Sequence, residues 1–235
     1  MSIAENVASI RRQMAEAARQ AGRDPSEIQL CAATKMNDAQ AVREAIAAGV
    51  DCCGENRVQE LTEKLKANAY EGAPVHFIGH LQTNKVRQVV GKVDLIQSVD
   101  SLHLLKAINA EAAKQGICQA ILLEVNVAGE ESKSGFATEE LPEILAEIGE
   151  YSNVCVKGLM AIPPISQKSG DNLKYFQKIF QISVDIKGKK YDNVKVDCLS
   201  MGMSNDFVDA IYSGTTMIRV GTAIFGPRDY AVIHQ

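Results

Sequence analysis

Short apolar runs alternate with helix-like segments along the whole chain, and this alternation limits the fold more than any other feature. Eight runs have the apolar character of strands buried on both faces: residues 29–34, 52–54, 76–79, 95–97, 120–126, 154–160, 195–199 and 217–220. Between them lie segments with the spacing or capping residues of helices: residues 38–48, 58–69, 101–115, 138–149, 172–186 and 205–212. Such alternation predicts a parallel sheet of the α/β class.

Eight β/α units in 235 residues predict a single (β/α)8 TIM barrel, somewhat shorter than the roughly 250 residues that are typical. The last unit is short, because only residues 222–225 remain before Gly226-Pro227. An additional amphipathic helix over residues 3–22 comes first, and we expect it to fill the resulting gap in the outer ring. We expect one domain over residues 1–235. An open doubly wound sheet is the alternative fold, because alternation alone does not exclude it.

Composition and charge argue against several classes of function. The net charge is −4 and no Lys/Arg block occurs, so nothing favours nucleic-acid binding. No apolar run approaches the roughly 18 residues of a membrane span, and the first residues lack the pattern of a secretory signal. The six cysteines form no C-x-x-C pair, which favours buried reduced thiols over disulfides or a metal site. Reduced thiols are typical of the cytoplasm.

Lys35 ends the first apolar run, where a charged side chain is unusual. In a barrel of parallel strands, the carboxyl ends of the strands meet at the face that carries function. Desolvation lowers the pKa of a lysine, and a neutral amine can attack an aldehyde. A surface lysine at the start of a loop is the alternative interpretation, and its position alone does not decide between the two.

Two segments near the end of the sequence are suited to binding a phosphate group. Ser200-Met201-Gly202-Met203-Ser204 follows the seventh run, and its glycine allows the backbone to approach a ligand closely. Ser204 fits the N-cap of a helix that begins near Asn205, an arrangement that binds anions but is also common as a structural turn. Gly221-Thr222 follows the eighth run, where such barrels frequently bind phosphate. An imine-forming lysine with a phosphate site predicts pyridoxal 5'-phosphate as the cofactor.

Arg219 lies inside the eighth run and therefore needs a partner. The structural interpretation is an ion pair with Glu124 or Asp197, and the functional one is a hydrogen bond to the pyridine ring of the ligand. Because arginine does not readily give up its proton, a pyridine nitrogen that faces it stays unprotonated and the ring is a weak electron sink. Asn56, after the second run, is a candidate for positioning the ring, or else it begins a helix.

Several segments together resemble the pyridoxal phosphate homeostasis protein family over nearly the whole chain. They are Ala33-Thr34-Lys35, Gly54-Glu55-Asn56, the run from His76 to Lys85, Lys133-Ser134-Gly135-Phe136, Gly158-Leu159-Met160, Ser200-Met201-Gly202-Met203-Ser204 and the run from Arg219 to Gly226. Arg57 departs from the family pattern, in which an aromatic residue is frequent at this position.

The resemblance implies a barrel similar to the N-terminal domain of alanine racemase. It implies that Lys35 holds the cofactor as an internal imine and that Arg219 faces the pyridine nitrogen. It also matches Lys133 to a family lysine that takes part in cofactor transfer. The residues that the resemblance places around the phosphate are Ser200, Ser204, Gly221 and Thr222.

Three functions can use such a site. We expect a monomeric carrier without substantial turnover and without catalytic residues, which buffers pyridoxal phosphate or delivers it to apo-enzymes that depend on it. The first alternative is a racemase or lyase, but inversion needs a proton-transfer group on each face of the cofactor. In alanine racemase the second group is a tyrosine from another domain, and only about 10 residues follow Gly221-Thr222 here. The second alternative is a Schiff-base aldolase that acts on a phosphorylated sugar, which would be colourless.

Overall fold

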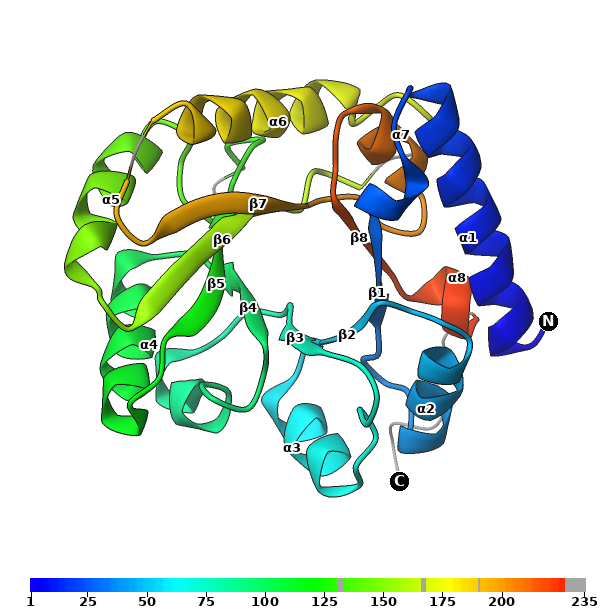
Figure 1. Ribbon diagram of the computed structural model, residues 1–235, viewed down its shortest axis with the longest axis horizontal. Helices are drawn as coiled ribbons and strands as arrows, with labels where there is room; N and C mark the ends of the chain where they lie inside the picture. Colours follow the sequence, from blue (N-terminus) through cyan, green and yellow to red (C-terminus); the bar gives the residue numbers. More distant parts are fainter. Residues whose placement is uncertain (131–132, 166–167, 190, 227–235) are drawn as a thin grey trace.

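The strands of the chain close into a parallel barrel with helices around its outside (Figure 1). The computed structural model describes residues 1–130, 133–165, 168–189 and 191–226, and the strands named here belong to those ranges. They are β1 (Gln29–Ala33), β2 (Cys52–Glu55), β3 (Val75–Phe77), β4 (Leu95–Val99), β5 (Gln119–Val125), β6 (Val154–Ala161), β7 (Val194–Ser200) and β8 (Met217–Val220). Every predicted strand is present, which confirms the (β/α)8 barrel.

Closure of the barrel joins the first strand to the last one. β1 pairs in parallel with β8, with Gln29 opposite Met217 and Cys31 opposite Arg219. On its other side β1 pairs with β2, where Cys31 lies opposite Cys52. The alternative of an open doubly wound sheet is therefore wrong, since an open sheet would leave its edge strands without these pairings.

The helices surround the strands and agree with the predicted segments apart from their ends. They are α1 (Ile3–Gln20), α2 (Ala39–Ala47), α3 (Val58–Lys66), α4 (Leu102–Gln115), α5 (Leu141–Glu147), α6 (Leu173–Lys187), α7 (Phe207–Tyr212) and α8 (Thr222–Phe225). Short 3-10 turns occur at η1 (Pro25–Glu27), η2 (Thr83–Gln88) and η3 (Ile148–Glu150), and η2 takes the place of a full helix between β3 and β4.

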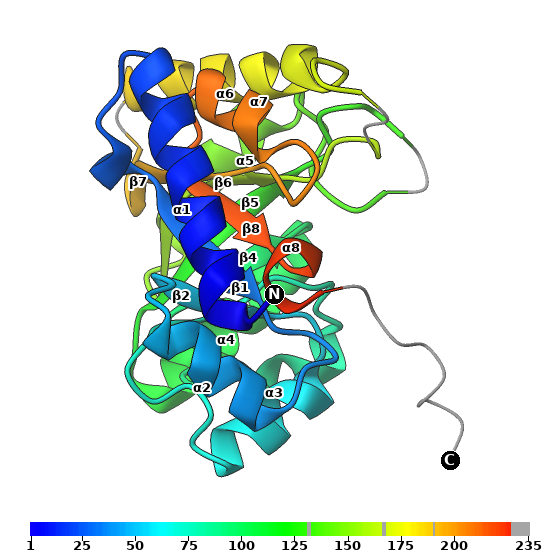
Figure 2. The same cartoon turned by 90° about the vertical axis from the view of Figure 1, so that its right-hand side faces the viewer.

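Helix α1 fills the gap that the short helix α8 leaves in the outer ring, as the sequence predicts. It packs against α2, α7 and α8, and Figures 1 and 2 show it lying along these three helices. Its buried face carries Val7, Ile10 and Met14, which follow the spacing of an amphipathic helix. The side-chain amide of Asn6 also donates to the carbonyl of Ile224 in α8 over 2.8 Å.

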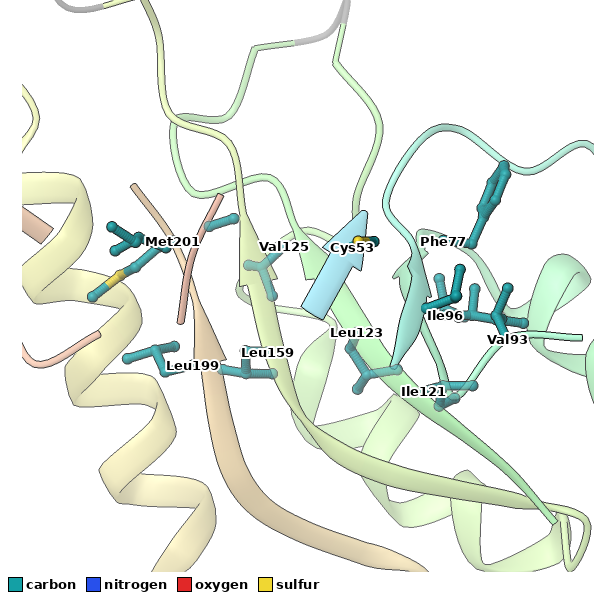
Figure 3. Packing of buried hydrophobic residues seen from close by; sticks show 14 of the residues in the cluster. Cys53, Phe77, Val93, Ile96, Ile121, Leu123, Val125, Leu159, Leu199 and Met201 are labelled. Atoms are coloured by element: carbon teal, nitrogen blue, oxygen red, sulfur yellow. The ribbon is translucent and has the colours of Figure 1, made fainter. Parts of the chain in front are cut away.

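The main apolar core lies between the strands and the helices. Ile96, Leu123 and Leu159 are fully buried members of it from β4, β5 and β6 (Figure 3). Smaller apolar groups form separate clusters, one of Cys31, Cys52 and Met217 and another around Leu122. Within the described ranges, no helix is both long and apolar enough to cross a lipid bilayer.

Candidate functional site

The predicted site residues all come from four consecutive strands of the barrel or the loops after them. Lys35 follows β1 and Asn56 follows β2. Ser200 ends β7, and Ser204 lies in the loop that leads to α7. Arg219 lies in β8, which Gly221 and Thr222 follow. Because β7, β8, β1 and β2 are neighbours in the barrel, these residues share one side of its carboxyl-terminal mouth.

Lys35 lies in a tight turn directly after β1. Its neighbour Thr34 is fully buried, whereas Lys35 itself is half-buried. The next residue, Met36, has φ of 61°, a left-handed conformation that costs a non-glycine residue on the order of 1–3 kcal/mol. The Asn37 side chain donates to the Lys35 carbonyl over 3.0 Å. The surrounding contacts therefore hold an unfavourable turn in place at this lysine.

A buried network of charged groups lies against the Lys35 turn. Lys64 of α3 donates to the Glu55 carboxylate over 2.6 Å and to Glu60 over 3.3 Å. The hydroxyls of Thr34 and Tyr70 also donate to Glu55, over 3.0 and 3.2 Å. Burial, followed by the charge of Glu55, raises the pKa of Tyr70, so the phenol keeps its proton and remains a donor.

Sequence reasoning did not identify Lys64 or Glu60 as part of the site. A signal for Lys64 was available, because Val58, Leu61 and Lys64 follow one another at intervals of three residues and share the buried face of α3. A lysine on the apolar face of a helix needs buried acceptors. Glu55 supplies one of them from the end of β2.

Asn56 has a buried oxygen that the described residues leave without a hydrogen-bond partner. The backbone N–H of Asn56 donates to Glu55 Oε1 over 2.8 Å, which fixes the main chain at the end of β2. The side-chain Oδ1 is inaccessible to solvent, yet no described group donates to it. An unpaired buried carbonyl costs about 1–3 kcal/mol. Such an atom at the mouth of the barrel is suited to receiving a donor from a ligand.

The two predicted phosphate segments contact each other. The N–H of Ala223, in the first turn of α8, donates to Ser204 Oγ over 3.4 Å. The prediction that Ser204 caps a helix from Asn205 is wrong, because α7 begins at Phe207 with Asp206 as its N-cap residue. Asp206 also accepts from the N–H of Met203 over 2.7 Å, and the helix begins two residues later than expected.

Gly202 is required by the fold of the loop that carries Ser204. Its φ is +93°, and an added Cβ would come within 2.6 Å of the Ala210 side chain on α7. The glycine therefore allows α7 to pack against the loop. This packing is a structural reason for the glycine, separate from any close approach of the backbone to a ligand.

Ser200 and Arg219 meet inside the barrel, where both side chains are buried. Arg219 Nη1 donates to Ser200 Oγ over 2.6 Å, and this hydroxyl donates to Gln97 Oε1 over 2.7 Å. The Gln97 amide nitrogen lies 2.9 Å from His76 Nδ1 and donates to it, since an amide NH2 has no lone pair to accept with. A row of hydrogen bonds thus crosses the barrel from β8 to β3. Its Gln97 and His76 members were not predicted.

The structural partners expected for Arg219 are not the ones it has. Asp197 forms an ion pair with Lys195 over 2.8 Å, and no ion pair joins Arg219 to Glu124 within the described ranges. Arg219 donates instead to Ser200 and, through Nη2, to the Ala161 carbonyl over 3.0 Å. Burial lowers its pKa, but a guanidinium remains protonated near neutral pH. Its bonds to described residues use two of its five side-chain N–H donors, which leaves the others available for a ligand in this part of the chain.

Acidic groups occupy the opposite wall of the mouth. Burial and the charge of Asp100 raise the pKa of Glu124, in β5, to about 7, although Arg219 and His80 oppose the shift. His80 Nδ1 lies 3.1 Å from Asp100. Glu124 is therefore able to exchange a proton near neutral pH.

Lys133, in the loop after β5, forms an ion pair with Glu130 over 2.9 Å.

Two thiols and an imidazole also gather in the barrel interior. Cys31, Cys52 and His76 are buried, and Cys52 Sγ lies 3.6 Å from His76 Nδ1. Their composition would suit zinc. However, the lone pair of His76 Nδ1 already accepts from Gln97, and both thiols pack in an apolar cluster with Met217, so we assign the group to packing. All six cysteines lie in described residues and none forms a disulfide. The expected burial holds for Cys31, Cys52 and Cys53, whereas Cys155 and Cys198 are half-buried and Cys118 is exposed.

The fold and the sequence define the class of protein. The family model for the alanine racemase N-terminal domain matches residues 5–229. An alanine racemase from Clostridium difficile has the same fold with a TM-score of 0.69 at 14% identity, over 94% of this chain and 57% of the racemase. The chain thus has the barrel of alanine racemases, and it spans little more than half of that enzyme.

Relatives of similar length identify the family more narrowly. The chain is 40% identical to the pyridoxal phosphate homeostasis protein of Aquifex aeolicus, over 98% of this chain and 100% of the relative. It superposes with a TM-score of 0.82 on PipY of Synechococcus elongatus, solved with pyridoxal phosphate bound, at 33% identity over 96% of this chain and 100% of PipY. The chain belongs to the pyridoxal phosphate homeostasis protein family, which confirms the resemblance.

Proposed function

We propose that this protein binds pyridoxal 5'-phosphate through Lys35 and serves in the homeostasis of this cofactor. The observation that carries the proposal is the grouping of Lys35, Asn56, Arg219 and Gly221-Thr222 on neighbouring strands at the mouth of the barrel. The buried oxygen of Asn56, to which no described residue donates a hydrogen bond, supports a polar ligand at this place. The bound cofactor in PipY, a relative at 33% identity, supports pyridoxal phosphate in particular.

Each residue has a separate role in this proposal. Lys35 provides the amine that attaches the cofactor covalently as an imine, while Asn56 orients the ring. The hydrogen bonds of Arg219 to Ser200 and to the Ala161 carbonyl fix its guanidinium in the barrel. In this fixed orientation, one of its remaining N–H donors binds the pyridine nitrogen. The phosphate is bound by the Ser204 and Thr222 side chains, the Gly221 backbone and the Ser200 end of β7. The contact between Ser204 and Ala223 brings the two phosphate-binding loops together.

The protein acts as a carrier rather than as an enzyme with substantial turnover. When bound, pyridoxal phosphate supplies an aldehyde carbon and a ring that can withdraw electrons. A guanidinium that faces the ring nitrogen keeps the nitrogen unprotonated, which weakens the withdrawal. Racemisation also requires proton-transfer groups on both faces of the ring. We propose further that the chain acts as one monomeric domain in the cytoplasm, and that apo-enzymes dependent on this cofactor receive it.

Borohydride reduction followed by peptide mass spectrometry tests the attachment. The purified protein is yellow if the proposal holds, and the reduced digest carries the cofactor mass on the peptide that contains Lys35. Lys35→Ala abolishes the visible band, whereas the matched control Lys85→Ala keeps it. Full visible absorbance in Lys35→Ala, with unchanged cofactor content, would overturn the assignment of Lys35.

Assays for racemisation of the common amino acids test the carrier role. We expect turnover far below the median of about 10 per second for enzymes. Turnover close to that value would establish the racemase alternative. A colourless protein that binds no pyridoxal phosphate but cleaves a phosphorylated sugar would instead establish the aldolase.

A further inference from the structure

We infer that Lys64 and Glu60 are positioning residues that fix the main chain on both sides of Lys35. The inference rests on the proposed function, because it assigns them the task of preparing the Lys35 amine for condensation with an aldehyde. Neither residue precedes or follows Lys35 closely in the sequence. Both project from helix α3, which packs beside the end of β2.

The peptide unit before Lys35 is held by Lys64. The Lys64 ammonium donates to the Thr34 carbonyl over 2.8 Å, to Glu55 Oε2 over 2.6 Å and to Glu60 Oε2 over 3.3 Å. These acceptors match the three N–H donors of an ammonium group. The orientation of the Thr34 carbonyl determines the plane from which φ of Lys35 is measured, so this contact limits rotation on the amino side of Lys35.

The peptide unit after Lys35 is held by Glu60. Its Oε2 accepts from the Met36 N–H over 2.6 Å. The carbonyl of the same peptide unit belongs to Lys35, and it accepts from the Asn37 side chain over 3.0 Å. This unit is thus held at both ends, which limits ψ of Lys35. One oxygen of Glu60 receives both the Lys64 ammonium and the Met36 amide, so the two restraints belong to one network.

The network also reaches Asn56, in the loop after β2. Glu55 is fully buried and accepts from Lys64 and Thr34 through Oε2, and from the Asn56 N–H through Oε1. The Lys35 turn and Asn56 are therefore anchored to the same carboxylate. A simple structural ion pair would stabilise α3 against β2 without contacting the backbone at Lys35. The contacts to Thr34 and Met36 distinguish a positioning role from that one.

The chemical step that benefits is condensation of the amine with an aldehyde. The Lys35 nitrogen forms a bond to the aldehyde carbon, and after proton transfer the aldehyde oxygen leaves as water, which gives an imine with no net oxidation. The rate depends on how well the amine is oriented, and a displacement of about 1 Å can lower the rate of an oriented reaction roughly a hundredfold. Loss of the restraints should therefore lower the rate constant of imine formation. The final occupancy of Lys35 by cofactor should change less.

Two pairs of variants on α3 test the inference. Lys64→Met is compared with Lys66→Met, which removes an exposed lysine from the same helix. Glu60→Gln is compared with Glu63→Gln, which removes an exposed carboxylate. Each full-length protein is stripped of cofactor, checked by circular dichroism and thermal melting, and mixed with pyridoxal phosphate. Growth of the visible imine band gives the rate constant, and borohydride trapping at the end point gives the occupancy of Lys35.

We expect Lys64→Met and Glu60→Gln to lower the rate constant by roughly ten- to a hundredfold, while both exposed controls keep the wild-type rate. If Lys64→Met does not fold, Glu60→Gln alone decides, because it leaves the Lys64–Glu55 pair intact. Wild-type rates in the folded variants would overturn the inference. The proposed function would still hold in that case, provided that the wild-type protein carries cofactor on Lys35. A wild-type protein without cofactor on Lys35 would instead contradict the proposed function itself.

Discussion

The hydroxyl of Ser200 lies between Arg219 and Gln97, accepting a hydrogen bond from Nη1 of the arginine and donating one to Oε1 of the glutamine. This single oxygen, which is buried, connects strand β8 to strand β4 across the barrel interior. Arg219 therefore has a fixed orientation that does not depend on an acidic partner. The direction in which its remaining N–H donors point follows from a serine at the end of β7.

Replacement of Ser200 by alanine should destabilise the protein by about 1–3 kcal/mol, because it leaves a buried guanidinium donor and a buried amide oxygen without partners. Urea unfolding of cofactor-free protein measures the change. Ser152→Ala, which removes an exposed hydroxyl, should alter the free energy of unfolding by less than about 0.5 kcal/mol. Equal effects of the two substitutions would show that the Ser200 hydroxyl does not bridge Arg219 and Gln97.

Asn56→Ala should separate stability from cofactor binding. Since the buried Oδ1 has no partner among the described residues, its removal breaks no hydrogen bond and relieves a desolvation cost of about 1–3 kcal/mol, so the free energy of unfolding of the cofactor-free protein should not fall. The same substitution should raise the Kd for pyridoxal phosphate roughly tenfold, the loss of about 1.4 kcal/mol of binding free energy. Equilibrium dialysis measures the Kd, with Gln59→Ala on the exposed side of α3 as control. An unchanged Kd would exclude Asn56 from the ring-binding group.

Glu124→Gln should make the stability of the cofactor-free protein less dependent on pH. Burial and Asp100 raise the pKa of Glu124 from 4.5 to about 7, so the folded state holds this proton more tightly than the unfolded state. The resulting penalty is absent below pH 4.5, grows as the pH rises towards 7 and is complete above it. At its upper limit it amounts to about 3 kcal/mol. The wild type should therefore lose stability between pH 5 and pH 8 relative to the variant.

Urea unfolding at both pH values measures this difference. Glu63→Gln, at an exposed position of α3, serves as the control. If Glu124→Gln stabilises the protein equally at pH 5 and pH 8, Glu124 does not gain a charge in the folded state over this range.

The sequence was most informative where local pattern and strand order determine the outcome. Apolar runs located the eight strands, and the short segment after Val220 correctly indicated that the N-terminal helix fills the ring beside α8. The positions of Lys35 and Asn56 after β1 and β2 followed from the strand ends. The first residue of a helix is harder to predict from the sequence. Ser204 and Asp206 both suit the N-cap of α7, and only the three-dimensional structure of the loop selects Asp206.

Contacts between distant strands could not be predicted in the same way. The partnership of Ser200 with Gln97 depends on the stagger of β7 against β4 across the interior, which no local pattern encodes. The cause is similar for Arg219: its place in an apolar strand indicates that it needs a partner, but not that the partners are a serine and a carbonyl rather than an acidic residue. Lys64 is different, because its spacing from Leu61 on α3 indicated burial, although not the carbonyl that it would bind.

The pairing of Gln29 in β1 with Met217 in β8 has a consequence for how the molecule is made. The ribosome synthesises β1 well before β8. One edge of β1 and the apolar face of α1 therefore stay uncovered in the nascent chain until β8 has been made. Sealing of the barrel is then a late, long-range event. Agents that bind emerging polypeptides have that whole interval in which to encounter α1.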